Sequence, residues 1–221
     1  MKHRILAVCA LTALGMGSSV SNANVVQFTA FGDQLAGGLL TIDFMPGPGA
    51  PVITVSAPIF VAGPGHGRAI IPDPFGNPFP GAIFDCVGET FSTLWSLENL
   101  ADASIVRAHF DLAGSISLFD DDSTPSTFDS SVGVAGVIYN PASTAPPEIF
   151  SGELNPWGDP KNMGDMFLEQ VIRWPAPDAA SSYFIGGMTY LWNDDTDIIP
   201  APGAAALLGM GVLAAARRRR R

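Results

Sequence analysis

The segment Ser104–Leu112, SIVRAHFDL, decides the fold class, because its side chains divide between the two sides of an extended chain. One side would carry three small or apolar side chains, those of Val106, Ala108 and Phe110. The other side would carry a mostly polar set, namely Ile105, Arg107, His109 and Asp111. Successive side chains of a β-strand point to opposite faces of a sheet. The segment therefore predicts a β-strand with these two sets on opposite faces.

Many other segments have the same strand character and are separated by turn signals. They are residues 25–31, 39–45, 52–56, 59–62, 82–85, 90–98, 115–119, 132–139, 149–154, 166–174 and 182–192. Residues 36–38, Ala-Gly-Gly, indicate a hairpin between the segments 25–31 and 39–45. Residues 166–174 fit either a strand or a short helix. About twelve short strands without a long amphipathic helix predict an all-β fold, either a β-sandwich or a jelly roll.

Three details of this layout can be checked against a structure. In residues 90–98, one face would carry Phe91, Thr93, Trp95 and Leu97. Residues 63–81 are dense in Gly and Pro and predict a long surface loop, in which residues 68–71 are a candidate short strand. Residues 193–199 are expected to connect the last strand to the C-terminal tail. No linker divides residues 24–199, so we expect one domain.

The body of the chain, residues 24–199, is strongly acidic. It contains all 21 acidic residues and four basic ones, Arg68, Arg107, Lys161 and Arg173, which gives a net charge of −17. Such a surface repels nucleic acid and anionic lipid and attracts divalent cations or basic partners. We therefore expect no nucleic-acid partner.

Cysteine and tryptophan give further expectations for the body. Cys86 is the one cysteine in residues 24–199, so an internal disulfide is excluded there. Its apolar neighbours favour a buried, inert thiol over an intermolecular link. Tryptophan rings can stack on sugars, and the chain has four, Trp95, Trp157, Trp174 and Trp192. Core packing is the alternative, and Trp157, between Pro156 and Gly158, is the one most expected to be exposed.

Catalytic motifs are missing from the sequence. It contains no Gly-x-Ser-x-Gly, no His-Glu-x-x-His and no Walker loop. His66 is expected in a loop, and His109 on a strand as a satisfied histidine. A triad of residues distant in sequence remains open, as does a carboxylate pair for glycoside hydrolysis.

Two acidic clusters are candidates for calcium, which takes six to eight oxygen ligands in proteins. The first, Asp120, Asp121 and Asp122, begins a polar loop, and the second places Asn193, Asp195 and Asp197 at alternate positions. Neither has the spacing of an EF-hand. The alternative is that both clusters are solvated turns that protect strand edges.

The N-terminal residues 1–23 predict a signal peptide. Lys2, His3 and Arg4 precede an apolar run over residues 5–16, and Ser21 and Ala23 suit the minus-three and minus-one positions of a cleavage site. We expect this segment to form a helix during export and the mature chain to start at Asn24.

The C-terminal tail, residues 200–221, reads PAPGAAALLGMGVLAAARRRRR. Residues 201–216 carry no charge and would span roughly 24 Å as a helix, against about 30 Å for a bilayer core. The tail ends in a cluster of five arginines, Arg217, Arg218, Arg219, Arg220 and Arg221. Such a cluster stops transfer and stays in the cytoplasm. We therefore expect a short transmembrane helix with the body on the far side.

This order of a Pro-rich turn, a small apolar span and a terminal arginine cluster resembles the PEP-CTERM sorting signal of Gram-negative bacteria. Pro200 and Pro202 match the prolines of the family's Pro-Glu-Pro motif, Ala201 replaces its Glu, and Gly203 follows. The resemblance implies that the exported protein is held in the inner membrane until an exosortase cleaves near this motif. It is then moved outward, often in bacteria that make extracellular polysaccharide. The resemblance covers the tail alone and implies no activity for the body.

These features together predict an exported, non-enzymatic protein of the cell surface or extracellular matrix. A carbohydrate-binding module and a secreted hydrolase are the alternatives for the body.

Overall fold

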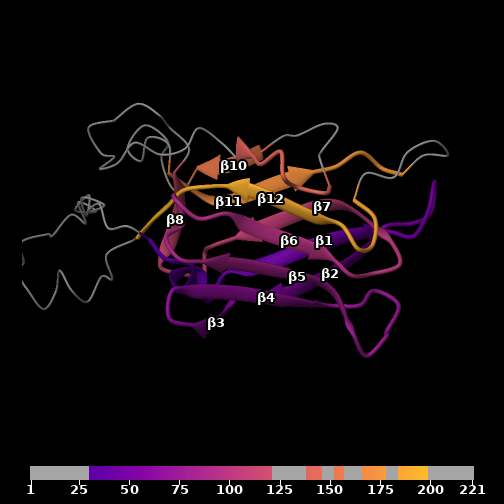
Figure 1. Cartoon of the computed structure of the whole chain (residues 1–221), viewed down its shortest axis with the longest axis horizontal. Coiled ribbons are helices and arrows are strands. Elements are labelled where there is room, and N and C mark those ends of the chain that lie inside the picture. Colours follow the sequence, from indigo (N-terminus) through magenta and orange to yellow (C-terminus); the bar gives the residue numbers. More distant parts are fainter. Residues whose placement is uncertain (1–29, 121–137, 146–151, 157–165, 178–183, 199–221) are drawn as a thin grey trace, which may run out of the picture.

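A computed structural model of the protein describes residues 30–120, 138–145, 152–156, 166–177 and 184–198 (Figure 1). Within these ranges nearly all regular structure is strand, which confirms the all-β prediction. In chain order the elements are η1 (Gly32–Leu35, a 3-10 helix), β1 (Leu39–Met45), β2 (Ile53–Pro58), β3 (Phe60–Gly63), β4 (His66–Pro72), β5 (Pro80–Val87), β6 (Trp95–Asn99), β7 (Ser104–Asp111), β8 (Ser117–Asp120), β9 (Ile138–Tyr139), β10 (Gly152–Pro156), β11 (Met166–Arg173), β12 (Thr189–Asn193) and β13 (Thr196–Ile198).

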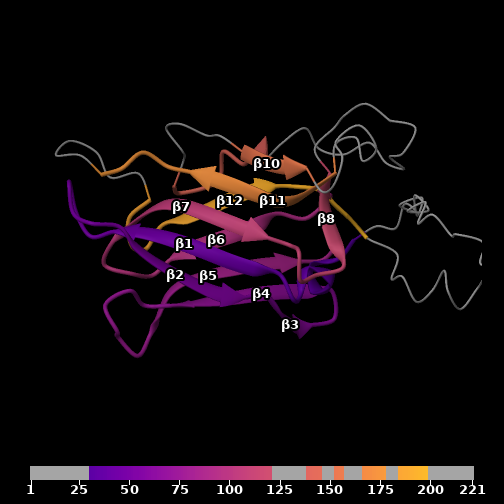
Figure 2. The same cartoon turned by 180° about the vertical axis from the view of Figure 1, so that it is seen from behind.

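The strands form two antiparallel sheets that face each other. The first sheet has the order β13-β8-β11-β7-β1-β2, with β10 also paired to β11. The second sheet has the order β3-β4-β5-β6-β12-β9. Figure 1 looks onto the second sheet, and Figure 2, from behind, looks onto the first. Pro58 ends β2, and after the buried Ile59 the chain continues as β3 in the other sheet. This corner agrees with the expected break at proline, which cannot donate to a ladder.

A single apolar core lies between the sheets and draws side chains from both. Its largest fully buried side chains are aromatic: Trp95, Trp192, Tyr190, Phe44, Phe84, Phe110, Phe119 and Phe184. Trp95 lies at the centre of this group, with ring centroids 5.6 Å from Phe84, 5.8 Å from Trp192 and 6.2 Å from Phe110. The core therefore depends on tilted and edge-to-face aromatic pairs, the arrangement that aromatic quadrupoles favour.

The strand that decides the fold class, β7, lies in the middle of the first sheet but contains a bulge. Asp43 on β1 pairs with Arg107 and Phe44 pairs with Ile105, so Val106 is an extra residue. A bulge reverses the alternation of side chains on its two sides. Ile105 is consequently buried in the core with Ala108 and Phe110, whereas Val106 is only partly buried. The prediction was right for Ala108 and Phe110 and wrong for Ile105 and Val106.

The predicted long loop over residues 63–81 is mostly strand. β4 occupies His66–Pro72 and pairs with β5 along its length, so the loop itself covers residues 73–79. Gly67 has a packing role, because a Cβ there would lie 2.0 Å from the carbonyl oxygen of Gly32. A glycine that permits close approach of two backbones looks, in the sequence, the same as a loop glycine.

Three other strand predictions differ from the structure. The predicted hairpin with residues 25–31 is wrong, because both edges of β1 are occupied, by β2 and β7. β6 begins at Trp95 rather than at residue 90, so Phe91 is exposed while Trp95 and Leu97 face the core as expected. Part of the predicted connector 193–199 is strand β13, which pairs with β8.

In the later part of the chain the predicted strands are present, but their limits differ from the predicted ones. Residues 166–174, for which a strand or a helix was open, contain strand β11. The strands predicted over 149–154 and 182–192 correspond to β10 and β12 with shifted limits. Of the strand predicted over 132–139, the structure describes Ile138 and Tyr139, which form β9.

The two ends of the described body meet at Thr90. Its backbone N–H donates to the Ala30 carbonyl at 2.9 Å, and its hydroxyl lies 3.1 Å from the Thr196 hydroxyl. The first described residue and the last strand, β13, therefore lie at one end of the molecule. In Figure 1 this is the left end, opposite the loop that joins β4 to β5. Within the described ranges, no helix has the length and apolar character that crossing a membrane requires. The predicted signal helix and the predicted span 201–216 lie outside those ranges.

Candidate functional site

Ion pairs join β4 and β5 on the outer face of the second sheet. His66 lies on strand β4 rather than in a loop, and its Nε2 is 2.5 Å from Oδ1 of Asp85 on β5. Arg68 donates to both oxygens of the same carboxylate, from Nε at 2.6 Å and from a terminal nitrogen at 3.0 Å. Burial alone would raise the pKa of Asp85, but the hydrogen bonds from Arg68 and His66 outweigh it and lower that pKa. The carboxylate is therefore ionised and engaged as a structural partner.

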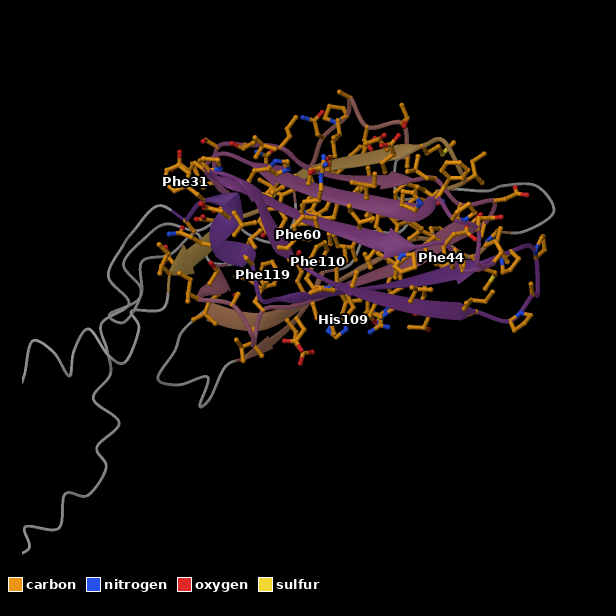
Figure 3. All side chains as sticks on the ribbon, turned by 90° about the horizontal axis from the view of Figure 1, so that it is seen from below. Phe31, Phe44, Phe60, His109, Phe110 and Phe119 are labelled. Atoms are coloured by element: carbon orange, nitrogen blue, oxygen red, sulfur yellow. The ribbon has the colours of Figure 1, made fainter. Side chains whose placement is uncertain are left out.

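The outer face of the first sheet carries a second polar network. His109 on β7 lies 3.1 Å from Glu169 on β11, and Arg107 donates to Asp43 at 3.2 Å. Figure 3 shows His109 on the outside of this sheet, away from Phe110. His66 and His109, the two histidines of residues 24–199, are therefore both paired with carboxylates. This agrees with the expectation of a satisfied histidine at position 109.

The thiol of Cys86 is buried in the core, as predicted. It has no exposed surface, and burial raises its pKa from 9.0 to about 12. A thiol with this pKa is almost entirely protonated at neutral pH, and only the thiolate is a strong nucleophile. Cys86 is therefore a packing residue.

The three tryptophans that the structure describes do not form a sugar-binding surface. Trp95, Trp174 and Trp192 are buried, Trp95 and Trp192 completely, so core packing is the correct reading for these three. Trp157 lies outside the described residues. Trp174 packs against Phe184 and Tyr190, with centroids 4.8 and 4.9 Å away.

The two predicted acidic clusters approach each other through the β8–β13 pairing. Thr196 pairs with Phe119, so the next residues outward, Asp195 and Asp120, lie at the same end of this short ladder. Asn193 belongs to β12 in the other sheet, and the chain crosses between the sheets after it. Asp121 and Asp122 lie outside the described residues.

The second cluster is not the solvated turn that was the alternative to calcium. Asp194, Asp195 and Asp197 are 2%, 7% and 4% exposed, and the backbone N–H of Asp195 donates to Asp194 at 3.0 Å. Among the residues that the structure describes, no three His, Cys, Asp or Glu side chains are grouped as metal ligands would be. Calcium at these positions stays a prediction.

A group of exposed apolar side chains that the sequence analysis did not single out lies at the end of the molecule opposite Thr90. We call it the distal rim and define it as Phe75, Phe79, Leu100 and Ile185. These side chains are 46%, 77%, 41% and 39% exposed. They come from the loops that join β4 to β5, β6 to β7 and β11 to β12, which lie together at the right in Figure 1.

The sequence contained a signal for the two phenylalanines of this rim. Residues 74–79, Pro-Phe-Gly-Asn-Pro-Phe, repeat the pair Pro-Phe within a Gly- and Pro-rich stretch. Proline fixes its own φ, so Pro74 and Pro78 restrict the loop backbone next to each phenylalanine. Residues 63–81 were predicted as a long surface loop with a candidate strand at 68–71, and that prediction made no use of this pattern.

Two of the three loops of the distal rim are joined by the buried side chain of Asn99. Its amide donates to the carbonyls of Ala103 at 2.8 Å and Phe184 at 2.6 Å, and its oxygen accepts from the N–H of Ala101 at 3.1 Å. The side chain therefore fixes the β6–β7 loop and attaches the segment before β12 to it.

Comparisons with protein-family models, curated proteins and solved structures gave no match for this chain. The class that its geometry defines is an all-β protein of two antiparallel sheets with ion-paired outer faces and an exposed apolar rim at one end. The sorting residues Pro200, Ala201, Pro202, Gly203 and Arg217–Arg221 lie outside the described residues.

Proposed function

We propose that the chain is an exported, non-enzymatic protein of the bacterial cell surface or extracellular matrix. In this proposal an exosortase-type enzyme releases it from the inner membrane, where the C-terminal tail holds the body on the periplasmic side. The single observation that carries the proposal is the tail sequence, with Pro200 and Pro202 before an uncharged run and five terminal arginines. The predicted signal peptide supports the same direction of export.

The layout of the body is compatible with attachment through one end. Strand β13 ends at Ile198, two residues before Pro200. The hydroxyl of Thr90 lies within hydrogen-bond distance of both the Thr196 hydroxyl in that strand and the Ala30 carbonyl. A chain attached through β13 would present the distal rim away from the point of attachment. This supports a body displayed outward.

The environments of the two histidines and the cysteine of the body support the proposal that the protein is not an enzyme. His66 and His109 are paired with carboxylates on sheet faces, and Cys86 is buried with a raised pKa. For the fold we infer a β-sandwich rather than a jelly roll, because β3, β4, β5 and β6 are consecutive neighbours in one sheet. Two jelly-roll Greek keys would instead alternate strands between sheets.

Removal of Arg217–Arg221 is expected to abolish retention in the inner membrane. Without the stop-transfer charges, the short apolar run is too weak to halt export. Immunoblots of fractionated producing cells should then show the body outside the membrane fraction, with its C-terminus unprocessed. Replacement of the five arginines by lysines is the matched control and should keep retention, because lysine carries the same charge. Equal retention of the deletion variant would contradict the proposal.

A further inference from the structure

The distal rim draws exposed side chains from three loops, and backbone hydrogen bonds join these loops at their bases. The N–H of Leu100 donates to the carbonyl of Gly81 at 2.8 Å, which joins the β6–β7 loop to the base of the Phe75–Phe79 loop. The N–H of Gly187 donates to the carbonyl of Asn99 at 2.7 Å, which attaches the turn that carries Ile185. The loops that carry the four exposed apolar side chains are thus connected through their backbones.

The Phe75–Phe79 loop is held in place by Asp73. One oxygen of this carboxylate accepts three hydrogen bonds, from the N–H of Phe75 at 2.8 Å and from the backbone and side-chain nitrogens of Asn77 at 3.2 and 3.0 Å. Gly76 occupies the left-handed region with φ +80, which glycine adopts without strain. Gly81 packs closely on the loop base, since a Cβ there would lie 2.9 Å from the carbonyl oxygen of Pro72.

Because Asp73 and the two prolines restrict its backbone, the Phe75–Phe79 loop has less conformational freedom to lose on binding. A flexible loop loses conformational freedom when it binds, whereas a loop already fixed by hydrogen bonds and prolines does not. The hydrogen bonds of Asp73 hold the loop backbone at Phe75 and Asn77, and Phe79 follows in the same loop with 77% of its surface exposed. Apolar side chains gathered on a rigid, exposed tip are characteristic of an interaction surface.

Charge and hydrogen-bonding groups limit the partner. The body carries a net charge of −17, and the rim loops contain no Lys or Arg, so anionic lipids and acidic polymers are repelled. A second copy of the chain would carry the same repulsive charge. Two carboxylates lie beside the rim, that of the exposed Asp102 and that of the partly buried Asp73, whose Oδ1 accepts the loop hydrogen bonds. A partner with apolar faces, hydroxyl donors and no negative charge matches both the rings and these acceptors.

We propose that the distal rim binds a neutral polysaccharide, with the rings of Phe75 and Phe79 stacked on the C–H faces of its sugars. Carboxylates of the flanking residues accept hydrogen bonds from its hydroxyl groups. This inference builds on the proposed function in one respect, that an exported body meets polysaccharide outside the cell. The binding itself does not require the tail to be processed.

Affinity electrophoresis of the full chain tests the proposal, in native gels with a polyoxyethylene detergent that contains no sugar. The gels contain increasing amounts of hydroxyethylcellulose, dextran or, as the acidic comparison, alginate. We expect at least one neutral polymer to slow the protein and alginate to have no such effect. The double variant Phe75→Ala/Phe79→Ala should bind about tenfold more weakly or worse, which corresponds to loss of the stacking contacts.

Phe91→Ala is the matched control, because Phe91 is an exposed phenylalanine at the other end of the molecule. It should leave the retardation unchanged, and urea unfolding should give the same midpoint for all three proteins. The proposal would be overturned if the double variant bound the polymer as tightly as the wild type. It would also be overturned if Phe91→Ala weakened binding as much as the double variant does. So would retardation by alginate alone, no retardation by any neutral polymer, or self-association of the wild type that the double variant loses. None of these results would bear on membrane retention of the tail, so the two proposals fail separately.

Discussion

Replacing Trp95 by alanine should destabilise the body by about 3–5 kcal/mol, the range for truncating a large aromatic residue in a core. Trp95 is completely buried, and its ring contacts Phe84, Trp192 and Phe119 from both sheets. Its Nε1 also donates to the carbonyl of Thr90 at 3.2 Å, at the point where the two ends of the body meet. The substitution therefore opens a cavity and loses a buried hydrogen bond. Since small domains have about 5–15 kcal/mol of net stability, much of the reserve would be lost.

Urea unfolding followed by tryptophan fluorescence and circular dichroism would measure this loss. Phe91→Ala serves as control here too, because a truncated exposed ring should change the free energy of unfolding by less than about 0.5 kcal/mol. A Trp95→Ala protein as stable as the control would contradict the assignment of this residue to the centre of the core.

Replacing Asn99 by alanine is expected to cost about 2–4 kcal/mol and to loosen the distal rim. The side chain is completely buried and makes three hydrogen bonds to backbone groups of two loops. After truncation these backbone groups lose their partner inside the protein, and each buried group left unsatisfied costs about 1–3 kcal/mol. Partial entry of water would limit the total. Ala101, Ala103 and Phe184 are the residues whose backbone would become mobile.

Hydrogen exchange provides a measurement specific to this site, alongside urea unfolding. Amides of residues 100–104 and 184–188 should exchange faster, whereas those of β4 and β5 should change only as much as global stability does. Asn140→Ala is a matched control, because the Asn140 side chain accepts one exposed hydrogen bond, from the N–H of Ala142. Equal destabilisation by both substitutions would show that the three buried hydrogen bonds of Asn99 are not what holds the loops.

Local patterns predicted the strands where side chains alternate without interruption. The predicted bounds of residues 39–45 are those of β1, in which Leu40, Ile42 and Phe44 face the core. In β7 the bulge at Val106 exchanged the faces of two residues, and nothing in SIVRAHFDL signals it. Its cause is the pairing with β1, so it depends on a partner strand more than sixty positions away.

Glycine and proline were the main source of error in the fold. In β4, Gly67 permits close approach to Gly32, and Pro72 sits at the end of a strand where no ladder donor is needed. Both residue types equally indicate a loop when read alone. The short strand β13 was missed for a related reason, because three residues carry too little pattern to predict a strand.

The candidate site was harder to predict than the fold because exposure depends on tertiary contacts. Tryptophan suggested a sugar-binding surface, yet Trp95, Trp174 and Trp192 are in the core. Phenylalanine, normally a core residue, supplies the exposed rings instead, at Phe75 and Phe79. Similarly, Asp195 and Asp197 belong to an acidic cluster for which a solvated turn was the alternative to calcium, but both are buried, and Asp197 pairs with Leu118 of β8.

The mass of the mature protein tests the central claim most directly. Protein should be isolated from the surface or the medium of producing cells, and its C-terminal peptide identified by mass spectrometry. The sorting proposal predicts a chain that ends near Pro200–Pro202 and lacks both the apolar run and Arg217–Arg221. A surface protein that still contains Arg221 would contradict cleavage and would leave the tail as a permanent membrane anchor.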